Sequence, residues 1–334
     1  MQATVDPGGP LHATPYAEAA AMTRRGWILF AAMAVIWGIP YLLIKVAVDE
    51  IAPATLVLAR TGLAALLLMP IALARGQIRP LLPRWKALLL YTVVEICGPW
   101  LLLGFAEQRL SSSLTGLLVA GVPLVGALLA RFGPDRERLG RRRLAGLLVG
   151  MAGVGALVGF EVGAGDVRAI LAVAFVVIGY ALGPAILART LSDLPSMGVV
   201  AASLAISAVA YLPAGILEAP SAWPSGKAVL AVLTLAVVCT AVAFLVCFRL
   251  IAEVGPARST VITYVNPAVA VLLGVLVLDE SFTVATGVGF ALILLGSVLA
   301  TSRRVGPTDP AIALDPDRAA PTAATRSGTG WVPA

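Results

Sequence analysis

Long apolar stretches alternate with short polar or charged segments over most of the chain. The last two stretches, residues 256–278 and 284–301, are joined by the acidic turn Asp279-Glu280-Ser281. A run of about 18 or more apolar residues is typical of a helix that crosses the ~30 Å hydrocarbon layer of a membrane. Strands of a membrane β-barrel would be about half as long and would alternate apolar with polar residues. The pattern therefore predicts membrane-spanning α-helices.

Ten such spans are expected, which makes the chain an all-α polytopic membrane protein. The predicted spans are residues 27–48, 53–74, 87–105, 111–130, 144–160, 169–188, 197–217, 228–248, 256–278 and 284–301. Each has about 17 to 23 residues, which is enough to cross a bilayer with modest tilt. The fifth is the shortest and is rich in glycine.

Composition and charge agree with a membrane protein. Hydrophobic residues make up 59% of the chain and charged residues 13%, against ~25% charged residues in soluble domains. The net charge of +6 does not indicate nucleic acid, because the basic residues lie between the spans rather than on one face. Since Cys97, Cys239 and Cys247 all fall inside spans, neither a disulfide framework nor a metal motif is predicted. No cofactor and no catalytic residue is expected.

The distribution of Lys and Arg predicts the orientation in the membrane. If the N-terminus is cytoplasmic, the cytoplasmic tails and loops hold 19 of these residues and the opposite loops hold three, Arg109, Arg168 and Lys227. We therefore expect a multi-pass protein of the plasma or inner membrane with both termini in the cytoplasm. The tails, residues 1–23 and 303–334, are rich in Pro, Ala, Thr and Asp and are expected to be disordered. Residues 1–23 lack a signal-peptide pattern, so the first span is expected to direct insertion.

The second half of the chain repeats the first at a shift of 144 residues. The matched pairs include Pro40 and Pro184, Lys45 and Arg189, Glu95 and Cys239, Trp100 and Phe244, and Pro123 and Pro267. Each copy, residues 24–160 and 161–302, contains five spans, and an odd number requires that the two copies insert with opposite orientation. Inverted repeats are typical of transporters, in which two similar halves open a shared midplane site to alternate sides of the membrane.

These residues also resemble a known family. The tract from Trp37-Gly38-Ile39-Pro40-Tyr41 to Lys45, residues 267–278, the Asp279-Glu280 turn, and Gly287, Gly289 and Gly296 resemble the EamA family of the drug/metabolite transporter superfamily. The resemblance covers about residues 27–302. It implies ten helices in two inverted five-helix halves, a central cavity between the first four helices of each half, and the fifth and tenth helices behind them. The chain departs from the family in its long basic turn, residues 133–143, and in Arg60, which the seventh span does not duplicate.

The expected function is secondary transport of a small metabolite, amino-acid-like or another small organic solute, by an exporter that works by alternating access. The main alternative that the family implies is exchange of nucleotide-sugars or sugar-phosphates. Such substrates call for clustered basic side chains in the cavity, and only Arg60 and Lys45 are available. An integral membrane enzyme is less favoured, because the loops are short and carry no catalytic constellation. The expected partners are a small-molecule substrate and the lipid bilayer.

Three ionisable side chains lie well inside the predicted spans, where charge is costly. Lys45 is near the outer end of its helix and can extend outward, toward Asp49. Arg60 lies roughly 10 Å from the outer end at ~1.5 Å per residue, where it makes a structural ion pair or helix-end contact, or binds a substrate carboxylate or phosphate. Glu95 lies close to the midplane. It either carries a coupling proton or binds a substrate amine, or it is a protonated carboxyl hydrogen-bonded to a neighbouring helix.

Further candidates lie near the proline-bearing centres of the spans. The expected substrate-binding residues there are Trp37, Tyr41, Trp100, Tyr180, Tyr264 and Asn266, with Phe244 beside them. Amphipathic rings suit a metabolite pocket, but aromatic residues in helices also serve packing. Prolines free backbone carbonyls and allow flexing, and the expected hinges are Pro40, Pro123, Pro184 and Pro267.

Two glycine motifs in the fifth span, Gly146-x-x-x-Gly150 and Gly155-x-x-x-Gly159, permit close approach of another helix. They predict packing within one subunit or, as the alternative, contact between subunits. The protein is therefore expected to be a monomer or a homodimer.

Overall fold

The computed structural model describes residues 22–132, 140–161, 166–255, 259 and 261–301. The predicted disorder of the two tails concerns residues that, apart from Met22 and Thr23, lie outside these ranges, as does most of the basic turn 133–143. Thr23 belongs to the fold, because its hydroxyl accepts a hydrogen bond from the amide of Gly26 at 2.9 Å and so caps the first helix.

Every regular element in the described part of the chain is a helix. In chain order the elements are α1 (Arg24–Gly38), α2 (Pro40–Val48), α3 (Pro53–Ala74), η1 (Arg79–Arg84), α4 (Trp85–Tyr91), η2 (Thr92–Cys97), α5 (Gly98–Glu107), α6 (Ser112–Val119), α7 (Val122–Phe132), α8 (Arg141–Glu161), α9 (Val167–Thr190), α10 (Ser196–Leu217), α11 (Gly226–Ala236), η4 (Val237–Val242), α12 (Ala243–Val254), α14 (Ile262–Leu278) and α15 (Val284–Thr301). Here η1 is a 3₁₀ helix, and η2 and η4 are π-helical turns.

Within the described residues, nine helical segments are long and apolar enough to cross a membrane. They are Arg24–Val48, Pro53–Ala74, Arg79–Glu107, Ser112–Arg131, Arg141–Gly159, Val167–Thr190, Ser196–Leu217, Gly226–Val254 and Val284–Thr301. The shorter apolar helix α14, with 17 residues, occupies the place of the ninth predicted span. The predicted all-helical membrane fold is confirmed. With α14 added to these nine segments, each of the ten predicted spans corresponds to a helix in the described residues.

The four predicted hinge prolines fall into two groups. In the first half, α1 ends at Gly38 just before Pro40, and the turn between α6 and α7 lies just before Pro123. In the second half, Pro184 lies inside the continuous helix α9 and Pro267 inside α14. A proline removes one backbone hydrogen bond, yet only the first-half pair coincides with a helix break.

The third span of each half contains a π-helical turn. The first is η2, between α4 and α5, and the second is η4, between α11 and α12. A π turn inserts one residue into an α-helix and shifts the direction in which the following side chains project, and such turns are frequent at functional sites. The repeat is thus visible in the backbone, at a position where the two sequences share no distinctive residue.

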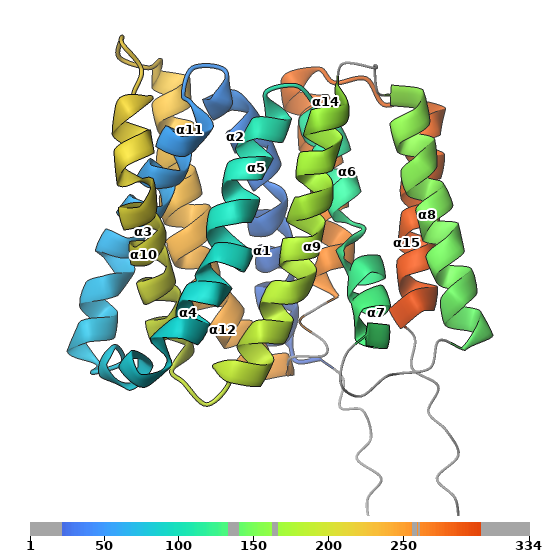
Figure 1. Ribbon diagram of the computed structural model, residues 1–334. Coiled ribbons are helices and arrows are strands. Elements are labelled where there is room, and N and C mark those ends of the chain that lie inside the picture. The colour runs from blue at the N-terminus through green and yellow to red at the C-terminus, as the bar shows by residue number, and fades with distance from the viewer. Residues whose placement is uncertain (1–21, 133–139, 162–165, 256–258, 260, 302–334) are drawn as a thin grey trace, which may run out of the picture. The chain divides into compact units, whose positions relative to one another are not determined.

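Helices of one half pack against helices of the other in a reciprocal pattern (Figure 1). The second, fourth and fifth spans each contact their own counterparts, in the pairs α3 and α10, α6 and α14, and α8 and α15. The third span of the first half packs on the first of the second half, α5 on α9, and α1 packs on α12 in return. Residues from both halves therefore meet at the centre of these contacts.

The last helices of the two halves, α8 and α15, approach through glycines (Figure 1). A Cβ at Gly153 would lie 2.8 Å from the carbonyl oxygen of Gly289, and one at Gly146 would lie 2.8 Å from the carbonyl oxygen of Gly296. The motif that begins at Gly146 therefore packs within one chain, as predicted. Gly155 and Gly159 have open space at their Cβ positions, so the second motif makes no such contact with the described residues.

Candidate functional site

Arg60 is the centre of the candidate site. Its side chain extends from α3 and is buried, with 8% of the residue exposed. The guanidinium Nε donates to Thr240 Oγ1 at 2.9 Å, and Cζ lies 3.6 Å from the centroid of the Trp100 ring. Trp100 belongs to α5 of the first half, and Thr240 to η4 of the second. The hydrogen bond to Thr240 thus joins the two halves, and the cation–π contact with Trp100 holds the same guanidinium within the first half.

The far end of the Arg60 guanidinium has no hydrogen-bond or ion-pair partner among the described residues. Among the described residues, no carboxylate forms a salt bridge with Arg60, and no hydrogen bond from Nη1 or Nη2 is present. The predicted alternative of a structural ion pair is therefore not seen in that part of the chain. Guanidinium donors are arranged as a fork that matches a carboxylate or phosphate. The two terminal nitrogens are suited to an anionic group of a ligand.

Two tyrosines complete the surroundings of Arg60. Tyr180, on α9 of the second half, lies beside Trp100, and Tyr41, on α2, is buried with 8% of the residue exposed. The hydroxyls of both tyrosines lie near enough to the Arg60 guanidinium to interact with its charge. The structure therefore brings together four residues that the sequence predicts at the site: Tyr41, Arg60, Trp100 and Tyr180.

The π turn η4 explains how Thr240 reaches Arg60. The Thr240 hydroxyl donates to the carbonyl of Leu235 at 2.8 Å, five residues back, and accepts from Arg60 Nε. In η2 the hydroxyl of Thr92 donates to Leu88 at 2.8 Å, with the four-residue spacing of an ordinary helix. Thr240 is not among the site residues predicted from the sequence, because a threonine in an apolar span does not by itself indicate a functional site. Its position next to Cys239, the counterpart of Glu95, is the one available indication.

Glu95 projects from η2 toward the second half. Its carboxylate packs on Gly183 of α9, where a Cβ would overlap Oε2 and lie 2.9 Å from the Glu95 Cβ. Oε2 is buried and has no hydrogen-bond partner among the described residues. Tyr180 lies within electrostatic range. The predicted hydrogen bond from this oxygen to a neighbouring helix is therefore not found in the described chain.

Glu107 is a second carboxyl in the third span, and it is not among the site residues predicted from the sequence. The span was predicted to end at residue 105, where hydropathy falls, but α5 continues to Glu107. Glu107 is fully buried, and neither carboxylate oxygen has a hydrogen-bond partner in the described structure. Lys45 Nζ donates to the Glu107 backbone carbonyl at 2.7 Å. In the described structure Lys45 is therefore bonded to this carbonyl and not to the expected Asp49.

The remaining predicted site residues contact other helices rather than Arg60. Trp37 packs edge-on against Phe244, with the ring centroids 6.3 Å apart. With its amide nitrogen turned toward the helix carbonyls, Asn266 donates to Ala34 at 3.1 Å and to Ile262 at 3.0 Å. The Tyr264 hydroxyl lies 3.0 Å from Thr301 Oγ1, at the end of α15. The contacts of Trp37 with Phe244 and of Asn266 with Ala34 join the two halves, and the contact of Tyr264 with Thr301 joins two neighbouring spans.

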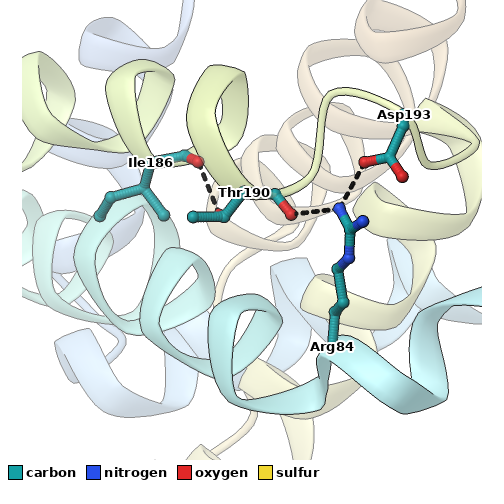
Figure 2. Close-up of polar contacts among 4 residues, drawn as sticks. All are labelled: Arg84, Ile186, Thr190 and Asp193. Carbon is teal, nitrogen blue, oxygen red and sulfur yellow. Dashed lines mark hydrogen bonds and ion pairs between the residues drawn. The ribbon is translucent and has the colours of Figure 1, made fainter.

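One end of the helices carries exposed polar links between the halves. Arg84, at the end of η1, donates through Nη1 to the carbonyl of Thr190 at 2.8 Å and pairs with the carboxylate of Asp193 (Figure 2). The Thr190 hydroxyl in turn donates to the carbonyl of Ile186 at 2.7 Å. The Arg84 and Asp193 side chains are 44% and 60% exposed, so solvent screens this pair.

The described ranges contain no group of three or more His, Cys, Asp or Glu side chains that could hold a metal ion. Cys97, Cys239 and Cys247 are all free and buried.

Comparison with known proteins shows the family to which the chain belongs. The model of the EamA-like transporter family matches residues 24–159 and, a second time, residues 167–302. This chain belongs to the EamA-like transporter family. It is similar to "Uncharacterized inner membrane transporter YedA" of Escherichia coli (strain K12), with 28% identity over 286 residues that cover 84% of this chain and 92% of the relative. The same protein of Escherichia coli O157:H7 matches to the same extent.

A solved structure supports the fold of this EamA-like transporter. A protein described only as "Crystal structure of protein" superposes with a TM-score of 0.60 at 24% identity, over 83% of this chain and 96% of that one. The predicted family is confirmed, and so is the prediction of a membrane transporter rather than an enzyme.

Proposed function

We propose that this EamA-like transporter exports a small organic solute with one anionic group, such as an amino-acid-like metabolite, across the inner membrane by alternating access. The observation that carries the proposal is Arg60. Its guanidinium lies between the two halves, is held by Trp100 and Thr240, and leaves Nη1 and Nη2 without a protein partner in the described chain. A carboxylate of the solute would complete the bonds of this buried cation.

The reciprocal packing of the halves supports alternating access. Each copy of the family repeat contains an odd number of spans, so we propose that the copies are inverted in the membrane. Contacts of the second, fourth and fifth spans with their own counterparts are consistent with the proposed inversion, because a two-fold axis in the membrane plane would bring corresponding spans together. Rocking of one half on the other would expose Arg60 first to one side and then to the other.

The cations near the site favour a single anionic group over a phosphate-rich substrate. Lys45 is bonded to the Glu107 carbonyl, and Arg60 is the cation in contact with Trp100 whose two terminal nitrogens have no hydrogen bond to the described residues. Nucleotide-sugars and sugar-phosphates carry several negative charges and require more cations. Glu95, close to Tyr180 on the second half, is then available for a substrate amine or for a coupling proton.

A metabolite comparison tests the role of Arg60. Cells that produce the wild-type chain, Arg60→Ala, Arg60→Lys, or no chain are compared for solutes inside and outside. Arg168→Ala is the matched control, because Arg168 is an exposed arginine at the start of α9. We expect the solute that wild-type cells export to be retained with Arg60→Ala, as in cells without the chain, and exported with Arg168→Ala. Wild-type export by well-folded Arg60→Ala protein would refute the proposed site.

The proposed orientation places both termini in the cytoplasm, on the grounds of the 19-to-3 distribution of Lys and Arg. Two exposed positions between spans test it, Arg75 after α3 and Trp223 before α11. In a background without native cysteines, an impermeant thiol reagent applied to intact cells should label Trp223→Cys and leave Arg75→Cys unlabelled. Labelling of Arg75→Cys alone would reverse the orientation.

A further inference from the structure

Glu107 is the most completely buried acidic side chain in the described structure. None of the residue is exposed, and Oε1 and Oε2 both lack a hydrogen-bond partner there. An ionised carboxylate in such a place would be an uncompensated buried charge, which is strongly unfavourable. The closed arrangement seen here is therefore compatible with a protonated Glu107.

The charged and titratable groups around Glu107 come from four elements. They are Tyr41 and Lys45 of α2, Arg60 of α3, Tyr180 of α9 and Glu280 of the turn after α14. Two of them already have other partners. Lys45 Nζ is bonded to the Glu107 backbone carbonyl, and the Glu280 carboxylate accepts from the amides of Ser112 at 2.7 Å and Ser113 at 2.9 Å. A small movement of Lys45, which has three donor hydrogens, would bring its ammonium to the Glu107 carboxylate.

We propose that Glu107 is a proton-binding site of the transport cycle, which holds its proton while this end of the helices is closed and releases it when the end opens. On release the carboxyl O–H bond breaks, the electron pair stays on the carboxylate, and the proton passes to water at that end. Lys45 then supplies the countercharge. The inference rests on the proposed transport function for its meaning, and it assigns the proton to a residue other than Glu95.

The structure indicates which end must open. Glu107 is the last residue of the helical segment that begins near Arg84, so the Arg84–Asp193 link (Figure 2) lies at the opposite end. The link at the Glu107 end is made by Glu50, which follows α2. The Glu50 carboxylate accepts from the Ser225 amide at 2.6 Å and from the Ser225 hydroxyl. Release of Glu50 from Ser225 would loosen the contact between α2 and α11 beside Lys45.

Infrared spectroscopy of the full chain in lipid bilayers tests the bound proton directly, because a protonated carboxyl has its own C=O stretching band. The comparison uses wild type, Glu107→Gln, Glu95→Gln and the control Glu218→Gln, which changes an exposed carboxyl just after α10. We expect part of the neutral-pH band to be lost in Glu107→Gln and kept in Glu218→Gln. Glu107→Asp, which retains a carboxyl, should keep it. An unchanged band in folded Glu107→Gln protein would overturn the proposal.

Titration of the same band tests release at the predicted end. Removing the link beside Glu107 with Ser225→Ala should shift the loss of the band to lower pH, because the opened form is more populated. Arg84→Ala, which removes a link at the opposite end, should not cause that shift. Lys45→Met removes the countercharge and should shift the loss to higher pH. Equal titrations of Ser225→Ala and Arg84→Ala would overturn the assignment of proton release to the Glu107 end.

These measurements need neither substrate nor transport. If Arg60→Ala exports normally while the Glu107 band behaves as expected, the proposed substrate site fails and the proton site stands. If Arg60→Ala fails to export and the Glu107→Gln band is unchanged, the reverse holds.

Discussion

The two halves of the chain have matching backbones and unequal chemistry. Both contain a π turn in the third span, and the second, fourth and fifth helices of each half pack on their counterparts. The arginine of the candidate site and the two glutamates of the third span, however, all come from the first half. Arg60, Glu95 and Glu107 belong to the first half, and the residues that contact or face them from the second are Thr240, Gly183 and Tyr180.

The difference shows what duplication preserved and what it left free to change. The glycine contact of α8 with α15 requires small residues on both helices, and both copies have them. The π turn of the third span is likewise present in both copies. Charges inside a membrane are costly, and a single cation between the halves can serve both. Even the prolines have diverged, because Pro40 and Pro123 coincide with helix breaks while Pro184 and Pro267 do not.

The largest effect is expected where the shared scaffold is tightest. A Cβ at Gly153 would lie 2.8 Å from two backbone atoms of α15, the Gly289 oxygen and the Ile293 nitrogen, and backbone cannot move aside. Gly153→Ala should therefore lower stability by about 3 kcal/mol, measured by thermal unfolding of purified protein. Gly155→Ala is the matched control, because its Cβ would meet open space; it should be neutral or stabilising by up to ~1 kcal/mol. Equal losses would show that α8 packs otherwise.

The two π turns offer the most direct comparison of the halves. Thr240→Val leaves Arg60 Nε without its acceptor, which should lower stability by about 2 kcal/mol and impair export. Thr92→Val removes only a bond to its own helix, to Leu88, and should change stability by less than about 0.5 kcal/mol. Thermal unfolding and export by the two variants measure the difference. A larger effect of Thr92→Val would contradict the central role of Arg60.

The contact between Glu95 and Gly183 tests η2, the π turn of the first half. A methyl group at residue 183 would displace a carboxylate rather than backbone, so Gly183→Ala should cost about 1 kcal/mol and reduce export. Adding Glu95→Ala should restore part of the lost stability, because it removes the overlap with the carboxylate and leaves only the 2.9 Å approach of the two Cβ atoms. Gly62→Ala, whose Cβ would make ordinary contact with Ala208 at 3.9 Å, is the control. Absence of rescue would show that Glu95 does not occupy the space above Gly183.

The smallest effect is expected at the exposed link between Glu50 and Ser225. Hydrogen bonds from the Ser225 hydroxyl and then the Ser225 amide lower the pKa of the Glu50 carboxyl. Its contribution to stability is therefore fully present above the ordinary glutamate pKa of ~4.3 and is lost as the pH falls through the lowered value. We expect the difference in thermal stability between wild type and Glu50→Gln to be small near neutral pH and to vanish in acid. A difference that grows in acid would contradict the link.

Much of the architecture follows from linear pattern. The apolar runs predict the spans, and the 144-residue shift predicts the repeat. Arg60, Glu95, Trp100 and Tyr180 stand out because polar or aromatic residues near the middle of an apolar span need a partner, and hydropathy makes them visible. The structure brings three of them together around the guanidinium and places Glu95 within electrostatic range of Tyr180.

Tertiary structure alone decided the rest. Glu107 lies at the edge of its apolar run, where a sequence cannot distinguish a solvated loop residue from one that neighbouring helices cover completely. Thr240 acquires its role only because a π turn and the packing of the second half aim its hydroxyl at Arg60. Asn266 and Tyr264 have the same polarity that marks a site, yet their contacts with Ala34 and Thr301 use it to join helices. Composition and periodicity report what a segment can bury, whereas the partner of each buried group depends on which helix lies beside it.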